Sequence, residues 1–225
     1  MVQTEEERKR YTDLMDYYTL WVHQIKTPIA AMDLLLQAKE EDTSALEVEL
    51  QRISQYVDMV LQYLRLDSET RDLDLQRCQL DAVIRQTVRK YAKLFILKKI
   101  RLTFQETHLE VRQRREVVGL LLEQVLSNAL KYTPPGERSA VFQDPAETLV
   151  IADTGIGIAP EDLPRIFDKG YTGHNGRMDK KATGIGLYLC RRVTNLLGHT
   201  ITVTSQLGQG TQVHLGLGRP KFDIE

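Results

Sequence analysis

The sequence predicts an α+β protein in which an antiparallel helical hairpin is followed by a domain of mixed helices and strands. Residues 1–66 contain no glycine, whereas all fourteen glycines of the chain lie in residues 119–218. Apolar residues in the first region recur at steps of three and four, which is typical of helices that pack along a narrow seam. The later region also contains short runs that are typical of strands. We therefore expect a helical domain in residues 1–66, a charged linker in residues 67–76 and a second domain in residues 77–220.

Two apolar seams define the expected hairpin. They are formed by Leu14, Tyr18, Trp21, Ile25, Met32 and Leu35 in the first helix and by Leu46, Leu50, Ile53, Val57, Val60 and Leu64 in the second. The polar residues 39–44 between them offer helix caps and a turn. Because two narrow seams cannot build a core by themselves, we expect the hairpin to pair with a second copy as a four-helix bundle. The alternative is a hairpin that packs on the C-terminal region of its own chain.

The composition limits the classes of function. The net charge is −1, from 30 basic and 31 acidic side chains, so the case for nucleic-acid binding is weak and we expect no such partner. Cys78 and Cys190 are far apart in sequence and are best interpreted as free thiols in a reducing compartment. The apolar stretches are far shorter than a bilayer span, and the polar first ten residues do not resemble a signal peptide. We expect the chain as given to be soluble, although it can be a piece of a membrane-anchored protein.

The second region has the element pattern of a mixed α/β domain. Helices are expected at residues 80–98, 115–132 and 185–197, and strands at residues 100–105, 109–113, 139–144, 147–152, 200–206 and 211–217. The strands at 139–144 and 147–152 are expected to form a hairpin.

One histidine in the first helix is placed away from the apolar seam. His23 is two residues from the nearest seam residue on each side, so at about 100° per residue it points roughly opposite the seam. Thr27 shares its face one turn later. Pro28 leaves the carbonyl of Gln24 without its usual donor, which predicts a kink beside the histidine. A solvated histidine in a helix is most often ordinary surface, but a neutral imidazole is also a competent nucleophile near neutral pH.

Glycine loops in the second region have features of a nucleotide site. In the first loop Asp153, whose carboxylate can accept a hydrogen bond from an exocyclic amine, precedes Gly155 and Gly157, which let the backbone approach a ligand. A second loop opens a helix, where free N–H groups favour phosphate. It contains Thr183, Gly184, Gly186 and Leu187. Residues 208–211 are either a third such loop or a plain hairpin turn. The loops fit neither the P-loop pattern nor the Rossmann fingerprint.

The helix expected at residues 115–132 carries a polar face formed by Gln124, Asn128, Lys131 and Tyr132. This face offers amide oxygens for Mg²⁺, which prefers oxygen ligands, an ammonium group for phosphate and a ring for stacking on a base. Taken alone, the pattern equally describes an amphipathic helix with a polar surface.

Together these segments resemble the cytoplasmic part of a bacterial sensor histidine kinase of a two-component system, over nearly the whole chain. The motifs occur in the family's order, with an H-box at His23–Pro28, an N-box at Asn128–Tyr132, a G1 box at Asp153–Gly157, an F-box at Arg165–Gly170 and a G2 box at Gly184–Leu187. The resemblance implies that the dimerising hairpin is followed by an α/β sandwich ATP-binding domain of the gyrase and histidine-kinase type. It also implies that His23 is phosphorylated from ATP and Mg²⁺, and that an aspartate of a response regulator receiver domain then takes the phosphoryl group.

The same resemblance gives roles to single residues. Asn128 would ligate Mg²⁺, with Gln124 as a further amide, while Asp153 would bind adenine and Tyr132 would stack near it. Residues 159–183 would form a mobile lid. Basic side chains of the lid could reach phosphate, namely Lys169 and Arg177.

The amino-acid sequences of two segments, Trp21–Pro28 and Thr183–Leu189, are similar to those of the intramembrane-sensing subgroup. Kinases of that subgroup answer cell-envelope stress and peptide antibiotics, often beside a transporter. The resemblance implies two membrane helices before residue 1, so that this portion is cytoplasmic while the full-length protein lies in the cell membrane, with a transporter as an expected partner.

The chain departs from the family at two positions. Gln24 stands where most members carry an acid, and a glutamine can orient the imidazole but cannot take its proton. Because phosphoryl transfer depends mostly on positioning, we expect autophosphorylation to survive at a lower rate. Gln124 stands in place of a second asparagine. Glu123 lies near the position at which related ATPases keep a water-activating glutamate. Its side chain is rotated by about 100° from the helix face that carries Gln124, so we expect little free ATP hydrolysis.

Two rival hypotheses stay open. A degenerate, nucleotide-binding scaffold without phosphotransfer is supported only by Gln24. A gyrase-like ATPase or a serine kinase of the same nucleotide fold is disfavoured by the hairpin with its outward-facing His23. Thr27 is equally well interpreted as a residue that positions water for a phosphatase reaction or as an ordinary surface threonine.

Overall fold

The computed structural model describes residues 2–38, 43–68, 77–145, 148–173 and 184–218. The chain divides into two compact units, unit 1 (Met1–Asp67) and unit 2 (Ser68–Glu225). Most of the linker expected at residues 67–76 lies outside the described residues. Within the described part of the chain, none of the helices combines the length and the apolar character that crossing a membrane requires.

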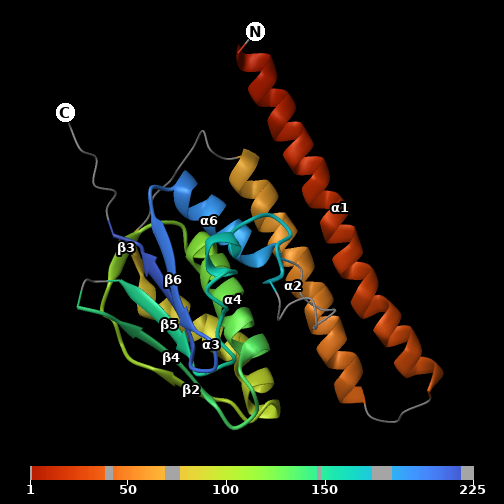
Figure 1. The fold of residues 1–225 in the computed structure, drawn as a ribbon, viewed down its shortest axis with the longest axis vertical. Helices are drawn as coiled ribbons and strands as arrows, with labels where there is room; N and C mark the ends of the chain where they lie inside the picture. Colours follow the sequence, from red (N-terminus) through yellow and green to blue (C-terminus); the bar gives the residue numbers. More distant parts are fainter. Residues whose placement is uncertain (1, 39–42, 69–76, 146–147, 174–183, 219–225) are drawn as a thin grey trace. The chain divides into compact units, whose positions relative to one another are not determined.

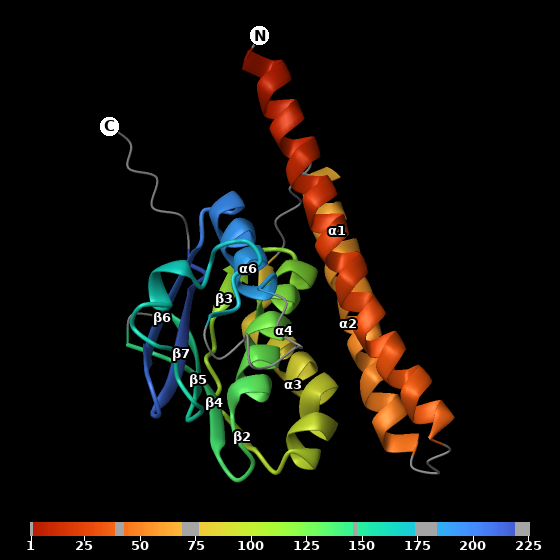
Figure 2. The same cartoon turned by 45° about the vertical axis from the view of Figure 1, so that its right-hand side comes forward.

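Unit 1 contains two long helices, α1 (Val2–Gln37) and α2 (Thr43–Ser68), where the two seams predicted them. They lie side by side in both views (Figure 1 and Figure 2), and the indole Nε1 of Trp21 donates a hydrogen bond to the backbone oxygen of Tyr56 at 2.9 Å. Pro28 lies inside α1, which continues beyond it for more than two turns. The turn between the helices lies outside the described residues.

The two helices leave many apolar side chains exposed. Val60 is buried, but Leu50, which was predicted to lie in the seam, is 55% exposed. A single contact between two helices covers only a narrow stripe of each, which explains why Leu50 is left out. Further large apolar side chains of this unit are exposed, namely Met15, Val22, Ile29, Leu34, Leu36 and Leu61. The four-helix bundle stays a prediction.

Unit 2 is built on a mixed sheet of five strands. Its spatial order is β2 (Arg101–Phe104), β4 (Arg138–Gln143), β5 (Leu149–Asp153), β7 (Gly210–Gly216) and β6 (Thr200–Gln206). β2 pairs with β4 in parallel, and the other neighbours pair antiparallel. One face of the sheet is covered by α3 (Leu80–Leu97), α4 (Arg115–Tyr132) and α6 (Gly186–Leu196), as Figure 2 shows. The predicted α/β sandwich is confirmed.

The helices and strands that were expected between residues 80 and 217 are present, with each end displaced by at most two residues. Two short elements were not predicted. β1 (Arg77–Gln79) pairs antiparallel with β3 (Glu110–Arg112), and a 3₁₀ helix, η1 (Leu163–Arg165), follows the first glycine loop. Neither three-residue segment shows a sustained alternating or helical period, so the sequence pattern did not reveal it.

Helix α4 forms the centre of unit 2. Its buried apolar side chains are Val117, Val118, Leu120, Leu121, Leu122, Val125, Leu126, Ala129 and Leu130. At its end, the Lys98 ammonium donates to the backbone oxygens of Leu130 at 2.7 Å and Lys131 at 3.3 Å. The last carbonyls of a helix have no partner within the helix, so Lys98 satisfies two of them and holds the last turn of α4 in place.

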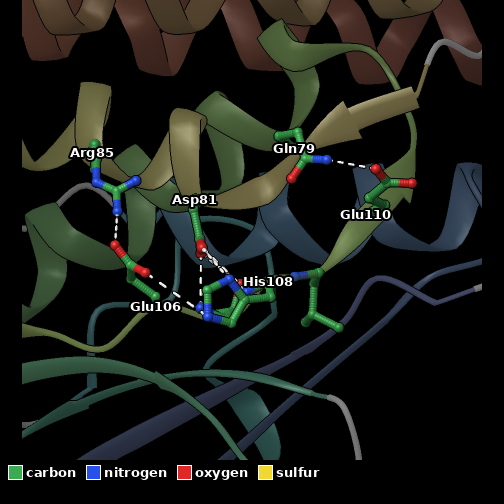
Figure 3. Close-up of polar contacts among 8 residues, drawn as sticks. Gln79, Asp81, Arg85, Glu106, His108 and Glu110 are labelled. Atoms are coloured by element: carbon green, nitrogen blue, oxygen red, sulfur yellow. Dashed lines mark hydrogen bonds and ion pairs between the residues drawn. The ribbon is translucent and has the colours of Figure 1, made fainter.

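The start of α3 is tied to the segment between β2 and β3 by Asp81 (Figure 3). Its carboxylate accepts hydrogen bonds from the backbone N–H of Thr107 at 2.9 Å, from its hydroxyl at 2.7 Å and from the backbone N–H of His108 at 3.1 Å. Burial raises the pKa of Asp81, but these hydrogen bonds outweigh it and hold the pKa below its ordinary value. An ion pair between Arg85 and Glu106 joins the same two segments.

Candidate nucleotide site

Asp153 ends β5 and starts the first glycine loop. It lies two residues after the buried Ile151, so both side chains leave the same face of the sheet. Its Oδ1 accepts a hydrogen bond from the backbone N–H of Gly155 at 2.9 Å. Burial raises the pKa of Asp153, and backbone hydrogen bonds from Gly155 and Thr211 only partly oppose this. The carboxylate is thus a half-buried acceptor, which suits the amine of a bound base.

The first loop is held in place by close backbone contacts. A Cβ on Gly155 would lie 2.5 Å from the backbone oxygen of Tyr132 and 2.7 Å from Oδ1 of Asp153. Gly157 has a φ of +69°, and a Cβ there would lie 2.1 Å from the backbone oxygen of Gln206. Only glycine fits at both positions. The loop is therefore fixed between the end of α4 and the turn that joins β6 to β7.

Helix α4 contacts both glycine loops. Its last residue, Tyr132, accepts a hydrogen bond at its backbone oxygen from the N–H of Ile156 at 3.1 Å. Two turns earlier, Oε1 of Gln124 lies so near Gly186 that a Cβ on this glycine would be 2.9 Å from it. Asn128 lies on the same stripe, one turn from each. One face of α4 thus contacts both glycine loops, through Gln124 at one end and Tyr132 at the other.

The second loop leads into α6. The backbone N–H of Gly170 donates to the oxygen of Gly184 at 3.1 Å, so the end of the predicted F-box lies beside the start of the predicted G2 box. α6 begins at Gly186, with Leu187 in its first turn. The first N–H groups of a helix have no partner within the helix and favour a bound anion.

A cluster of polar and aromatic side chains that the sequence pattern did not predict precedes this loop. The Tyr171 hydroxyl donates to Oδ1 of Asp162 at 2.6 Å, and the guanidinium of Arg165 lies 4.3 Å from the centre of the Tyr171 ring. Lys169, which was predicted to reach phosphate, is half-buried in the same segment. No short motif signals a pair such as Asp162 and Tyr171. Two residues predicted for the lid and the loop lie outside the described residues, namely Arg177 and Thr183.

Two further polar residues of α4, Lys131 and Glu123, contact different parts of unit 2. Lys131 has its Nζ 5.2 Å from the centre of the Tyr132 ring. The carboxylate of Glu123 instead binds Nζ of Lys90 on α3, at 3.0 and 2.9 Å. Glu123 is thus engaged with α3, in agreement with the rotation expected from its position in the helix.

The residues predicted for phosphotransfer lie in unit 1. His23 and Gln24 belong to α1, and their side chains are outside what the structure describes. Thr27 lies one turn after His23 on the exposed surface of the helix.

Comparison with known families agrees with this architecture. Residues 114–221 match the family described as histidine kinase-, DNA gyrase B- and HSP90-like ATPases. This match contains α4, both glycine loops and the strands between them. Residues 114–221 are therefore similar to the ATP-binding domains of that family, which is the kind of domain that the sequence resembled.

The curated relatives that the chain matches are sensor histidine kinases and sensor proteins. The chain is 31% identical to the sensor histidine kinase YxdK of Bacillus subtilis over 204 residues, which are 88% of this chain and 62% of that protein. It is 35% identical to the sensor protein BceS of Halalkalibacterium halodurans, with 85% of this chain and 58% of that protein covered. It is 37% identical to the sensor histidine kinase GraS of Staphylococcus haemolyticus, with 86% and 58% covered. The predicted resemblance to sensor histidine kinases of the intramembrane-sensing subgroup is confirmed.

Solved structures support the fold. The mycobacterial sensor histidine kinase MprB aligns with a TM-score of 0.56 at 26% identity, covering 64% of this chain and 99% of that one. The histidine kinase ThkA, in complex with the response regulator protein TrrA, aligns with a TM-score of 0.65 at 19% identity, covering 96% of this chain and 65% of that one. The chain spans about three fifths of the length of the curated relatives it matches.

Proposed function

We propose that this chain is the kinase portion of a sensor histidine kinase, which binds Mg²⁺ and ATP in unit 2 and phosphorylates His23 in unit 1. The observation that carries the proposal is the stripe of Gln124, Asn128 and Tyr132 on α4, which contacts one glycine loop at each end. A nucleotide needs a base site and a phosphate site a few ångströms apart, and this stripe joins the two.

The residues of the site fit ATP. Asp153 accepts a hydrogen bond from the adenine amine, and Gly155 and Gly157 let the first loop pack closely on the backbone of Tyr132 and Gln206, which holds the carboxylate in place. Lys131 and the first N–H groups of α6, including that of Leu187, favour the phosphates. Tyr132 supplies a ring near the base. Three further residues assigned to phosphate by resemblance keep that role in this proposal, namely Lys169, Arg177 and Thr183.

Asn128, with Gln124 one turn away, fits Mg²⁺ through amide oxygens, because this ion prefers oxygen ligands and keeps several waters. Bound between protein and phosphates, the ion would offset negative charge on the transferred group. The chain's own contribution is to hold the amide oxygens on a rigid, buried helix.

His23 acts as the nucleophile. Its imidazole nitrogen forms a bond to the γ-phosphorus while the bond from that phosphorus to the bridging oxygen of ADP breaks, and ADP leaves. The imidazole proton goes to solvent, because Gln24 orients the ring but is not a base. An aspartate of a response regulator receiver domain then takes the phosphoryl group. Thr27, on the face of His23, positions water for the reverse phosphatase reaction.

The exposed apolar side chains of unit 1 support a homodimer. A helical pair that leaves Leu34 67% exposed and Leu36 61% exposed is incompletely covered, and a second copy would bury these groups as a four-helix bundle. In the full-length protein, membrane helices precede residue 1, and a transporter in the same membrane is a partner of the kinase.

Labelling with Mg²⁺ and γ-labelled ATP tests the proposal. We expect acid-labile, alkali-stable label on the chain, and we expect it to disappear in His23→Ala and Asp153→Asn. His108→Ala is the matched control, because this histidine is exposed in unit 2 and should keep full labelling. Nucleotide binding without label would favour the degenerate scaffold that Gln24 suggests, and steady ATP turnover independent of His23 would favour a gyrase-like ATPase.

A further inference from the structure

Tyr171 lies directly after the predicted F-box, and its side chain is held both at its hydroxyl and at its ring. The hydroxyl donates to Oδ1 of Asp162 at 2.6 Å, a short distance that is typical of a hydrogen bond to a charged carboxylate. Asp162 is only 8% exposed, so water has little access to this bond. The guanidinium of Arg165 lies 4.3 Å from the centre of the Tyr171 ring, within the range of a cation–π contact. Two different contacts therefore fix the Tyr171 side chain.

Asp162 is itself fixed next to the first glycine loop. The backbone N–H groups of Asp162 and Leu163 donate to the oxygen of Ala159 at 2.9 and 3.2 Å, directly after that loop. The second carboxylate oxygen of Asp162 lies beside Gly173, which has a φ of +58°, and a Cβ on this glycine would be 2.9 Å from it. The carboxylate therefore contacts the segment around Tyr171 through both of its oxygens.

The backbone of Tyr171 packs against the start of the second glycine loop. A Cβ on Gly184, whose φ is +63°, would lie 2.6 Å from both the nitrogen and the oxygen of Tyr171. The N–H of Gly170 also donates to the oxygen of Gly184 at 3.1 Å. From α4, Oε1 of Gln124 approaches Gly186 at the other end of the loop. The second loop, which leads into the first turn of α6, is therefore contacted by Tyr171 at one end and by α4 at the other.

We propose that Tyr171 is a positioning residue for the phosphates of ATP, because its hydrogen bond to Asp162 holds the second glycine loop where the first N–H groups of α6 meet them. The inference rests on the proposed function, in which these N–H groups favour the phosphates. A Tyr171 side chain without this hydrogen bond would let its backbone and Gly184 move, and the N–H groups would turn away from the phosphates. The carboxylate of Asp153 belongs to β5 and the first loop, so the binding of the base should not depend on Tyr171.

Tyr171→Phe removes the hydroxyl and keeps the ring, and the full chain can be compared with wild type for two ligands. These are ATP with Mg²⁺ and adenosine, which has the base but no phosphates, both measured by displacement of a fluorescent nucleotide. We expect the Kd for ATP to rise by about three- to tenfold, because a hydrogen bond to a charged group is lost, and the Kd for adenosine to stay within about twofold. Tyr91→Phe, which removes the hydroxyl of a buried ring on α3, is the matched control and should change neither Kd. Asp153→Asn should weaken both ligands.

Asp162→Asn tests the same hydrogen bond from its other side. It keeps an oxygen that can accept from the Tyr171 hydroxyl, so the rise in the Kd for ATP should be smaller than in Tyr171→Phe, and the two losses should not add in the double variant. A Tyr171→Phe chain that loses ATP and adenosine equally, or that binds ATP as wild type does, would overturn the inference. Failure of the wild-type chain to bind ATP would overturn the proposed function instead. Should Tyr171→Phe not fold, the comparison of the two ligands in Asp162→Asn decides in the same way.

Discussion

Glu123 on α4 is joined to Lys90 on α3 through both of its carboxylate oxygens, at 3.0 and 2.9 Å from the ammonium nitrogen. This pair connects two of the helices that cover the sheet and leaves the neighbouring Gln124 beside Gly186 at the second glycine loop. One position along a helix therefore separates a residue that stabilises the fold from a residue of the nucleotide site. The pairing also disfavours Glu123 as a base that activates water.

Glu123→Gln should consequently leave the rate of autophosphorylation nearly unchanged and lower the stability of unit 2. We expect the autophosphorylation rate to stay within about twofold of wild type, and the free energy of unfolding to fall by about 0.5–1 kcal/mol, because the ion pair is only partly exposed. Labelling kinetics and urea unfolding measure the two effects. Lys90→Met is the matched control and should show the same loss of stability. A rate that drops at least tenfold in Glu123→Gln but not in Lys90→Met would show that Glu123 takes part in the chemistry.

Gln124 and Gly186 should be coupled energetically. In Gly186→Ala the new Cβ would lie 2.9 Å from Oε1 of Gln124, so either the side chain or the start of α6 must move. We expect ATP affinity to fall by about tenfold, equivalent to about 1.4 kcal/mol. The double variant with Gln124→Asn should recover part of this loss, because asparagine is one methylene shorter and keeps the amide.

A double-mutant cycle with a fluorescent nucleotide checks this coupling. Gly218→Ala is a suitable control, since a Cβ there would meet no atom within 4 Å. Strictly additive losses for Gly186→Ala and Gln124→Asn would contradict a direct contact between the two residues.

The buried carboxylate of Asp153 should lower the stability of the folded chain when no nucleotide is bound. Burial raises the pKa of its carboxyl above the unfolded value, so the ionised form is disfavoured in the folded chain at every pH above that raised pKa. The penalty disappears as the pH falls below the unfolded value. Asp153→Asn, which removes the charge and keeps an oxygen for the N–H of Gly155, should therefore melt at a higher temperature than wild type at pH 7 without nucleotide.

The same variant should lose the stabilisation that ATP gives to wild type. Thermal melts with and without Mg²⁺ and ATP show both effects in one experiment. An Asp153→Asn chain that melts lower than wild type without nucleotide would mean that the carboxylate supports the fold rather than the ligand.

The sequence predicted α4 with its ends because its apolar and polar faces have a clear helical period, and it predicted most of the strands because their residues alternate or are uniformly apolar. That Asn128, Asp153 and Gly184 share a nucleotide site stays a prediction from their motifs. The position of Ser139 opposite Asp153 could not be predicted, because it depends on the register of β4 against β5. The contact of Tyr171 with Asp162 was missed for a similar reason, since the 3₁₀ helix between them has no visible period.

Asp81 should stabilise unit 2 in a pH-dependent manner. Its three hydrogen bonds hold the pKa of the carboxyl below the ordinary value of 3.8, so its contribution is complete above that value and is lost as the pH falls through the lower, folded pKa. Asp81→Ala leaves the N–H groups of Thr107 and His108 without their acceptor and should cost about 1–3 kcal/mol of unfolding free energy at pH 7. Urea unfolding at a series of pH values should show a difference in unfolding free energy between wild type and Asp81→Ala that is unchanged from pH 7 to about pH 4 and closes only below it.

Glu106→Gln, which alters an exposed partner of Arg85 beside this site, is the control and should change the unfolding free energy by less than about 0.5 kcal/mol. A gap that closes between pH 7 and pH 5 would mean that Asp81 is protonated there, and the hydrogen bonds drawn in Figure 3 could not then hold its charge.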